Sequence, residues 1–132
     1  DVYYIFNNDS GSNYSYHNVT GGVGVTAQVN SGGSVNQTLG LLQWVSSTTG
    51  NAANVKTGGV MDILDYKNTS KYKTVRTLHG YDINTNASYA GTVSFSSGNW
   101  RNTNAINSIK FTTDSGTGFS EFSHFALYGI KA

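Results

Sequence analysis

Apolar and polar residues alternate along much of this chain. Residues 23–29 read VGVTAQV and residues 89–97 read YAGTVSFSS, so apolar side chains recur at every second position in each segment. In the second segment Val93 and Phe95 fall in one set, and Ser94 and Ser96 fall in the other. Successive side chains of a strand point to opposite faces of its sheet, so both segments are predicted to be strands with one buried face.

Other segments are apolar at consecutive positions. Residues 2–6 (VYYIF) and 39–45 (LGLLQWV) carry large apolar side chains on both faces, which is typical of central strands or of strands at an interface. Trp44 is therefore expected in the core. Residues 58–82 predict a hairpin whose turn contains KNTS at residues 67–70, and residues 105–113 predict a further strand.

The chain is predicted to be all-β. We expect about seven to nine short strands at near-regular spacing, which is typical of an antiparallel sandwich or barrel. Residues 102–111 could be fitted to a helical period, but their β-branched and asparagine residues disfavour a helix. The interpretation we adopt is a single domain over residues 1–132, an antiparallel β-sandwich of jelly-roll type.

The densest apolar stretch stands at the end of the sequence, where residues 118–132 read GFSEFSHFALYGIKA. In an extended conformation both faces of this segment are largely apolar. We therefore predict a core strand in the middle of a sheet, with its second face covered by the margin of the other sheet or by another subunit. Burial of Leu127 would make its replacement by Ala cost about 2–5 kcal/mol. The residues expected in this core or interface strand are Phe122, Phe125, Leu127, Tyr128 and Ile130.

Composition narrows the classes of function. Charged residues are 11% of the chain and the net charge is +1, so no strong field attracts nucleic acid or an anionic membrane. No apolar run approaches the roughly 18 residues of a membrane span. Cysteine is absent, so disulfides and thiolate metal sites are excluded. Solubility through Asn, Ser, Thr and Gly is common among extracellular and virion β-proteins.

Motifs of catalysis or metal binding are not found. Asp62 and Asp65 are the one close acidic pair, but their odd spacing places them on opposite faces of a strand. His17, His79 and His124 lack the spacing of metal ligands. No nucleophile elbow or phosphate-binding loop is present. We predict no catalytic residues, no metal, no cofactor and no enzyme activity.

Binding is better supported by the sequence, because nine Tyr, six Phe and two Trp are many for 132 residues. Tyr and Trp give rigid contact area that suits glycans and protein interfaces. Residues 97–104 (SGNWRNTN) place Trp100 and Arg101 among short polar side chains that could hydrogen-bond a sugar. Trp100 and Arg101 are therefore the candidate ligand-binding residues. The alternative is that Trp100 closes one end of the sandwich.

Several segments resemble one family. Residues 104–132 end in FALYGI (125–130) after an earlier Ala105, Ile106 and Ile109, and this resembles the C-terminal end of small jelly-roll-like β-sandwich domains in bacteriophage virion proteins. Residues 1–6 are similar to the first strand of these domains, and residues 9–18 to a later segment with the pattern D-x-G-x-x-Y. Residues 48–80 are similar to their central hairpin. In the family a further loop and strand usually separate the first strand from the D-x-G-x-x-Y segment. This chain therefore has a deletion or lacks residues near 7–9.

The resemblance implies a non-enzymatic structural protein of the virion, found at the particle surface or tail and otherwise extracellular. We expect a tail-fibre or appendage module that contacts the host surface as a trimer or higher homo-oligomer. Its partners would be itself, other virion proteins and a host-surface glycan. The alternatives are a capsid decoration (cement) protein, a glycan-binding module, and a self-assembling extracellular filament subunit. Asp1 in place of Met fits a processed chain or a part of a longer one.

Overall fold

The structure is a computed structural model that describes residues 1–22, 28–43, 56–83, 91–114, 118–119 and 121–130. The described residues form eight strands and no helix. Their bounds are β1 (Val2–Phe6), β2 (Tyr14–Gly22), β3 (Gln28–Gln37), β4 (Gly40–Gln43), β5 (Gly58–Ile63), β6 (Lys73–Asp82), β7 (Gly91–Trp100) and β8 (Ile109–Thr113).

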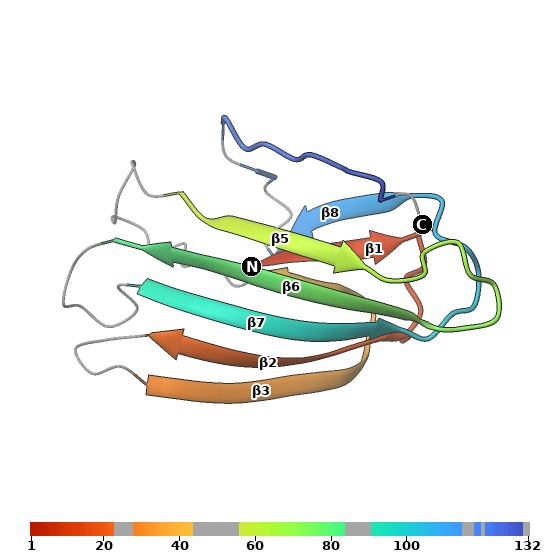
Figure 1. The fold of residues 1–132 in the computed structure, drawn as a ribbon, viewed down its shortest axis with the longest axis horizontal. Coiled ribbons are helices and arrows are strands. Elements are labelled where there is room, and N and C mark those ends of the chain that lie inside the picture. Colours follow the sequence, from red (N-terminus) through yellow and green to blue (C-terminus); the bar gives the residue numbers. More distant parts are fainter. Residues whose placement is uncertain (23–27, 44–55, 84–90, 115–117, 120, 131–132) are drawn as a thin grey trace.

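The strands form two antiparallel sheets that face each other, as Figure 1 shows. The smaller sheet has the order β4-β1-β8 and the larger has the order β3-β2-β7-β6-β5. The first strand pairs with the last, and the second pairs with the seventh. The remaining strands are added at the edges, with β3 beside β2 and the β5–β6 hairpin beside β7. The expected antiparallel β-sandwich is confirmed.

The apolar core occupies one end of the sandwich and is built mainly of aromatic rings. The Phe6 ring lies 4.8 Å from Tyr4 and 5.5 Å from Trp100, and the Tyr4 and Tyr14 centroids are 6.0 Å apart. Tyr4 lies so close to Gly40 that a Cβ there would come within 2.0 Å of the ring. Glycine is required at that position by this approach. Val75 and Ile106 complete the buried cluster.

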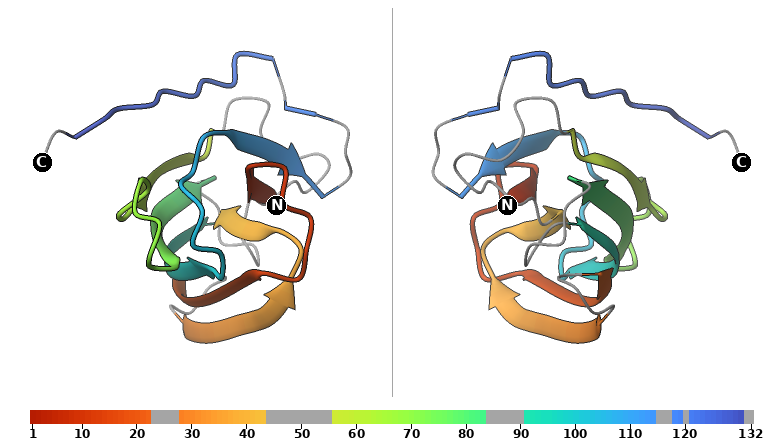
Figure 2. Two further views of the ribbon diagram at one scale, coloured as in Figure 1. Left: turned by 90° about the vertical axis from the view of Figure 1, so that its right-hand side faces the viewer. Right: turned by 90° about the vertical axis from the view of Figure 1, so that its left-hand side faces the viewer.

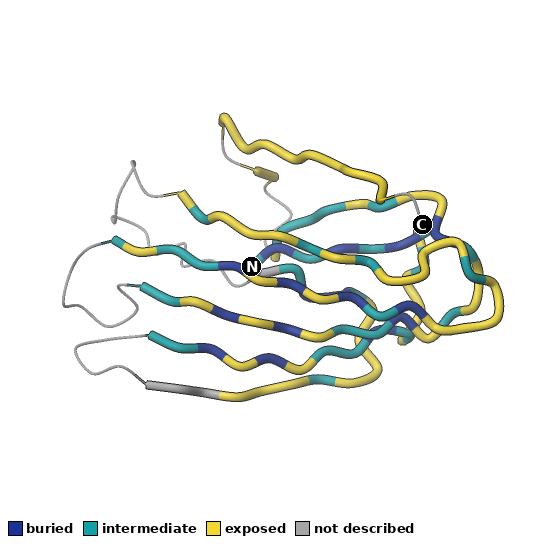
Figure 3. The backbone as a smooth tube through the Cα atoms, viewed as in Figure 1, coloured by how far each residue is buried: buried dark blue, intermediate teal, exposed yellow. Residues whose placement is uncertain are grey.

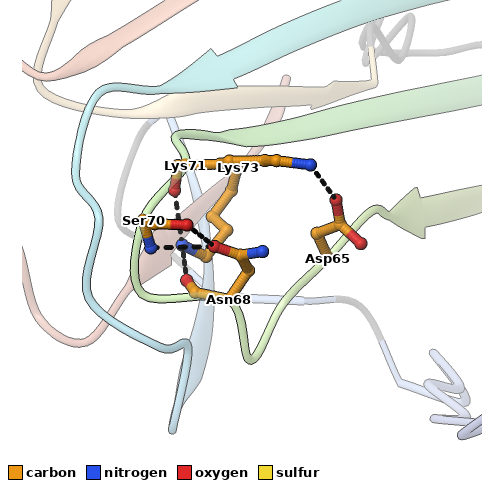
Figure 4. Close-up of polar contacts among 5 residues, drawn as sticks. All are labelled: Asp65, Asn68, Ser70, Lys71 and Lys73. Carbon is orange, nitrogen blue, oxygen red and sulfur yellow. Dashed lines mark hydrogen bonds and ion pairs between the residues drawn. The ribbon is translucent and has the colours of Figure 1, made fainter.

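A buried lysine fixes the loops at the same end. Lys73 is the first residue of β6 and is fully buried. Its ammonium donates hydrogen bonds to the carbonyl oxygens of Asn68 at 2.6 Å and Lys71 at 2.9 Å (Figure 4). A third bond of 3.2 Å goes to the carbonyl oxygen of Thr103. All three N–H donors therefore have partners, as a buried charge requires. Lys73 thus joins the β5–β6 turn to the segment that follows β7.

Most of the expected strands are confirmed. Residues 2–6 form β1, the central strand of the smaller sheet, and residues 58–82 form the β5–β6 hairpin with residues 67–70 in its turn. Within residues 39–45 the structure places β4, and within 105–113 it places β8. Residues 102–111 are not helical. Residues 23–27 and Trp44 lie outside the described residues.

The faces of β7 are the reverse of what hydrophobicity predicts. Its side chains alternate as expected, but Ser94 and Ser96 are buried, whereas Val93 and Phe95 are exposed. The tube in Figure 3 shows this alternation of buried and exposed residues along β2, β6 and β7. The period of two was predictable, and the assignment of the apolar set to the interior was wrong.

The predicted C-terminal core strand is also contradicted. Residues 121–130, here called the C-terminal arm, belong to no strand and are exposed at every position. Figure 2 shows the arm leaving the sandwich and ending clear of it. The physical reason is that no strand among the described residues pairs with the arm, although its Phe125 ring stacks on Phe111 of β8 at 4.9 Å. The exposed fractions are 75% for Phe122, 54% for Phe125, 84% for Leu127, 85% for Tyr128 and 92% for Ile130.

Two leucine substitutions distinguish the core from the arm. Leu41 on β4 is 2% exposed, so Leu41→Ala should lower the free energy of unfolding by about 2–5 kcal/mol. Leu127→Ala should change it by less than about 0.5 kcal/mol, at concentrations too low for copies to associate. Urea unfolding of both variants measures this. A loss for Leu127→Ala equal to that for Leu41→Ala would mean that the arm is packed within its own sandwich.

Replacement of Lys73 by Met should destabilise the fold although methionine fits the same length. The three carbonyl oxygens would lose a charged donor, and one hydrogen bond to a charged group contributes about 1.5–3 kcal/mol. We expect a loss of at least that size in urea unfolding. Lys71→Met is the matched control, because the Lys71 ammonium is exposed and lies 3.9 Å from Asp65. If both variants unfold alike, the carbonyl site does not contribute to stability.

Candidate functional site

Trp100, one of the two predicted ligand-binding residues, lies in the interior. It is the last residue of β7, it is fully buried, and its indole Nε1 donates a 2.8 Å hydrogen bond to the Asp9 carboxylate. The ring therefore has no face open to a ligand. Its surroundings match the alternative interpretation, in which Trp100 closes one end of the sandwich.

Asp9 organises the turn that the Trp100 indole contacts. Its carboxylate accepts hydrogen bonds from the Gly11 N–H at 2.9 Å and from Asn13 Nδ2 at 3.0 Å. Burial raises the pKa of Asp9, but the bonds from Gly11, Trp100 and Asn13 outweigh it and hold the pKa below its ordinary value. The Tyr14 hydroxyl accepts from the Phe6 N–H at 2.9 Å and donates to the Asp9 carbonyl at 3.1 Å. The D-x-G-x-x-Y segment is thus a corner between the sheets.

Arg101, the other predicted ligand-binding residue, is exposed but already engaged. Its Nη2 donates to the Ser12 carbonyl at 2.7 Å and to Asn36 Oδ1 at 2.8 Å. It therefore ties the corner to β3. Trp100 and Arg101 are neighbours in sequence, yet one side chain points into the core and the other lies along the surface, so the structure does not bring them together as a binding site.

The interior beyond the aromatic core is polar. Two rows of paired residues cross the inner face of the larger sheet: Asn18, Ser96 and Thr77 in one, and Thr20, Ser94 and His79 in the other. All six are at most 6% exposed. Thr20 and Ser94 share a hydrogen bond of 2.9 Å. Within these two rows, Asn18 Oδ1, Thr77 Oγ1 and Ser96 Oγ have no hydrogen-bond partner among the residues that the structure describes.

The outer face of the same strands carries a row of apolar residues. Val60, Leu78, Phe95 and Val19 are register partners across β5, β6, β7 and β2, and they form one continuous row that we call the outer row. Their exposed fractions run from 45% to 65%. Contiguous apolar side chains on a surface mark an interaction site more often than scattered ones. This row is the strongest candidate for a functional surface within the sandwich.

A shallow hollow lies on the smaller sheet. It encloses about 390 Å³ and is lined by Tyr3, Tyr16, Lys110 and Asp114 among others. Burial, together with a hydrogen bond to Asp114, raises the pKa of Tyr3 to about 12. Aromatic, cationic and carboxylate groups in one hollow suit a small polar ligand. Neither Trp100 nor Arg101 lines it.

The described residues hold no group of three or more His, Asp or Glu side chains placed to bind a metal ion. Asp62 lies on β5 and pairs with Arg76 at 3.5 Å, while Asp65 lies in the following turn near Lys71. In the part of the chain that is described, no helix is long and apolar enough to cross a membrane.

Comparisons with protein-family models, with curated proteins and with solved structures find no match for this chain.

The outer row was missed by sequence reasoning. The signal was present in three of the four strands: Leu78, Phe95 and Val19 each stand between polar residues, whereas Val60 stands between Gly59 and Met61. Alternation of this kind predicts one apolar and one polar face but not which face turns inward. The packing of the two sheets decides this, and in the structure β4 lies against β2, β6 and β7.

The buried His79 predicts a dependence of stability on pH. Burial lowers its pKa below the ordinary value of 6.5, so the unfolded chain binds a proton more readily than the folded one. The free energy of unfolding should therefore be highest above pH 6.5 and fall as the pH drops below that value. Urea unfolding between about pH 7.5 and 5 measures the decline.

The variant His79→Gln should flatten this decline, since the titrating group is removed. His17→Gln is the matched control, because His17 lies on the exposed face of β2. An unchanged decline in His79→Gln would assign the pH dependence to other groups.

Proposed function

We propose that this chain is a non-enzymatic structural module of a bacteriophage virion, a tail-fibre or appendage domain that works as a trimer or higher homo-oligomer. The observation that carries the proposal is the outer row, an apolar surface across four strands of a sandwich. The resemblance of residues 1–6, 9–18 and 104–132 to phage virion domains supports the same assignment.

The distribution of side chains favours an assembly role. A free domain gains stability by burying its apolar residues, whereas beyond the aromatic core this one buries serine and threonine of β2, β6 and β7 and exposes Val19, Leu78 and Phe95 of the same strands. An exposed apolar row of this kind is stabilised when a neighbouring copy or another virion protein removes it from water. Few charges oppose such packing, because only 11% of the residues are charged.

Host contact would follow from repetition of the module. Each copy presents the hollow on the smaller sheet, whose tyrosines and charged groups could hold part of a glycan weakly. Several copies on one appendage would turn weak contacts into a firm attachment, since the second contact is intramolecular.

Cryo-EM of the native particle tests the proposed location. Density for this fold on a tail or projecting fibre is the expected result. Density at the junctions between capsomers would make the chain a cement protein, and a free filament built from this chain alone would contradict a virion role.

The role of the outer row is tested by the double variant Phe95→Thr, Leu78→Thr. Threonine suits exposed strand positions, so the thermal midpoint should change little. Self-association, measured by sedimentation velocity, should weaken by at least about tenfold because an apolar contact is removed.

The matched control is Ser97→Thr, Arg76→Thr, which changes the next exposed pair on the same two strands. The control should associate like the unmodified chain. Equal association of both double variants would show that the outer row is not an interface.

A further inference from the structure

The C-terminal arm has the sequence pattern of a strand but belongs to no sheet: residues 121–122 form a turn, in which Phe122 has a φ of 66°, and residues 123–130 belong to no element. Its apolar side chains alternate between two faces, with Phe122, Tyr128 and Ile130 on one and Phe125 and Leu127 on the other. No strand pairing among the described residues includes it. An extended segment with this exposure gains free energy by joining a sheet edge, where its backbone groups are paired and its side chains are covered.

One edge suits the arm by its position. Among the described strands β8 has β1 as its single neighbour, so its other side is an open edge of the smaller sheet. Figures 1 and 2 show the arm passing over the seam between β8 and β5. Behind this seam Met61 and Ile63 of β5 are only partly buried against the core. A strand added to β8 would cover them.

The ring contact indicates the register of this addition. Within one chain Phe125 stacks on Phe111 at 4.9 Å with planes 14° apart and meets the Phe119 ring edge-on at 4.9 Å, which shows that these rings fit one another. The same pair can form when the arm reaches the β8 edge of another copy. An antiparallel strand with Phe125 opposite Phe111 places Leu127 opposite Ile109 and directs both arm residues toward the interior. Ile109 and Phe111 already pack on the core. The apolar residues of arm and edge then match.

The arm's second face favours a second copy as the receiver. If the arm folded back onto its own β8, Phe122 and Tyr128 would face solvent. Tyr128 and Ile130 would also run past Ile109, the first residue of β8. Exchange between copies offers a second sandwich to cover that face, and the structure already carries the arm away from its own body (Figure 2).

We infer that the C-terminal arm of one copy adds as an antiparallel strand to the β8 edge of a second copy. Strand exchange of this kind uses backbone pairing for affinity and alternate side chains for specificity. The inference rests on the proposed role as an oligomeric module and names a second contact between its copies, apart from the outer row.

Engineered cysteines test the exchange, because the chain has none of its own. In the inferred register Lys110 of β8 stands opposite Ala126 of the arm, a spacing that a disulfide can bridge. The variants Lys110→Cys and Ala126→Cys are unfolded together in urea, refolded as a mixture and oxidised. A disulfide between the two different chains, seen by mass spectrometry on non-reducing gel bands, is the expected result.

The control mixture pairs Ala126→Cys with Ser97→Cys, an exposed position on the far sheet. This control should give at least about tenfold less of the mixed disulfide, because no specific contact holds positions 97 and 126 together. Equal yields in both mixtures would overturn the inference.

The double variant Lys110→Cys, Ala126→Cys separates exchange from closure within one chain. Exchange predicts covalent dimers at a concentration where the unmodified chain associates. A monomer with an internal disulfide would overturn the inference and return the arm to its own sandwich.

Sedimentation of the unmodified chain separates the inference from the function on which it rests. Association that persists in Leu127→Asp, with no mixed disulfide, would leave the oligomeric module standing and overturn the arm exchange. A chain that stays monomeric at every concentration would overturn both. The expected result is association that Leu127→Asp weakens by about 30-fold or more.

Discussion

The hydrogen bond between the Trp100 indole and the Asp9 carboxylate closes the one end of the sandwich that has an apolar interior. At this end β1 contributes Tyr4 and Phe6, and the larger sheet contributes Tyr14 and Trp100. Asp9 lies in the connection between these two sheets, so one carboxylate sets both the corner of the chain and the position of its largest ring. Removal of water from that ring cluster is the main source of stability available to a chain without disulfides.

Beyond these rings the sandwich depends on polar contacts. Hydroxyl and amide groups fill the inner face of β2, β6 and β7, and each hydrogen bond there contributes only about 0.5–1.5 kcal/mol after the loss of water. Such an interior holds two sheets together less firmly than an apolar one. The outer-row residues of the same strands lie outside, where they add little stability until another surface covers them. The polar interior and the outer row therefore have the same cause: these strands turn their polar face inward.

The sequence predicted where the strands lie better than it predicted which of their faces are buried. Alternation identified β7, and the apolar run at residues 2–6 identified β1, because local spacing reports the period of a strand. Which face is buried depends on the registers of distant strands, so Ser94 and Phe95 exchanged their expected places. The ligand-binding role predicted for Trp100 failed for the same reason. Its partner Asp9 is 91 residues away in the sequence, and no residue near Trp100 in the sequence indicates this contact.

The burial of the C-terminal arm also depends on something that the local sequence does not specify. Its residues predicted a buried strand because they are apolar on both faces, and that requirement holds whether one chain or two satisfy it. A sandwich edge can bury only one face of an added strand. A segment with two apolar faces therefore suits a position between two sandwiches. Residues 121–130 are too apolar for the surface of a free domain. Their composition is consistent with a domain whose copies assemble next to one another.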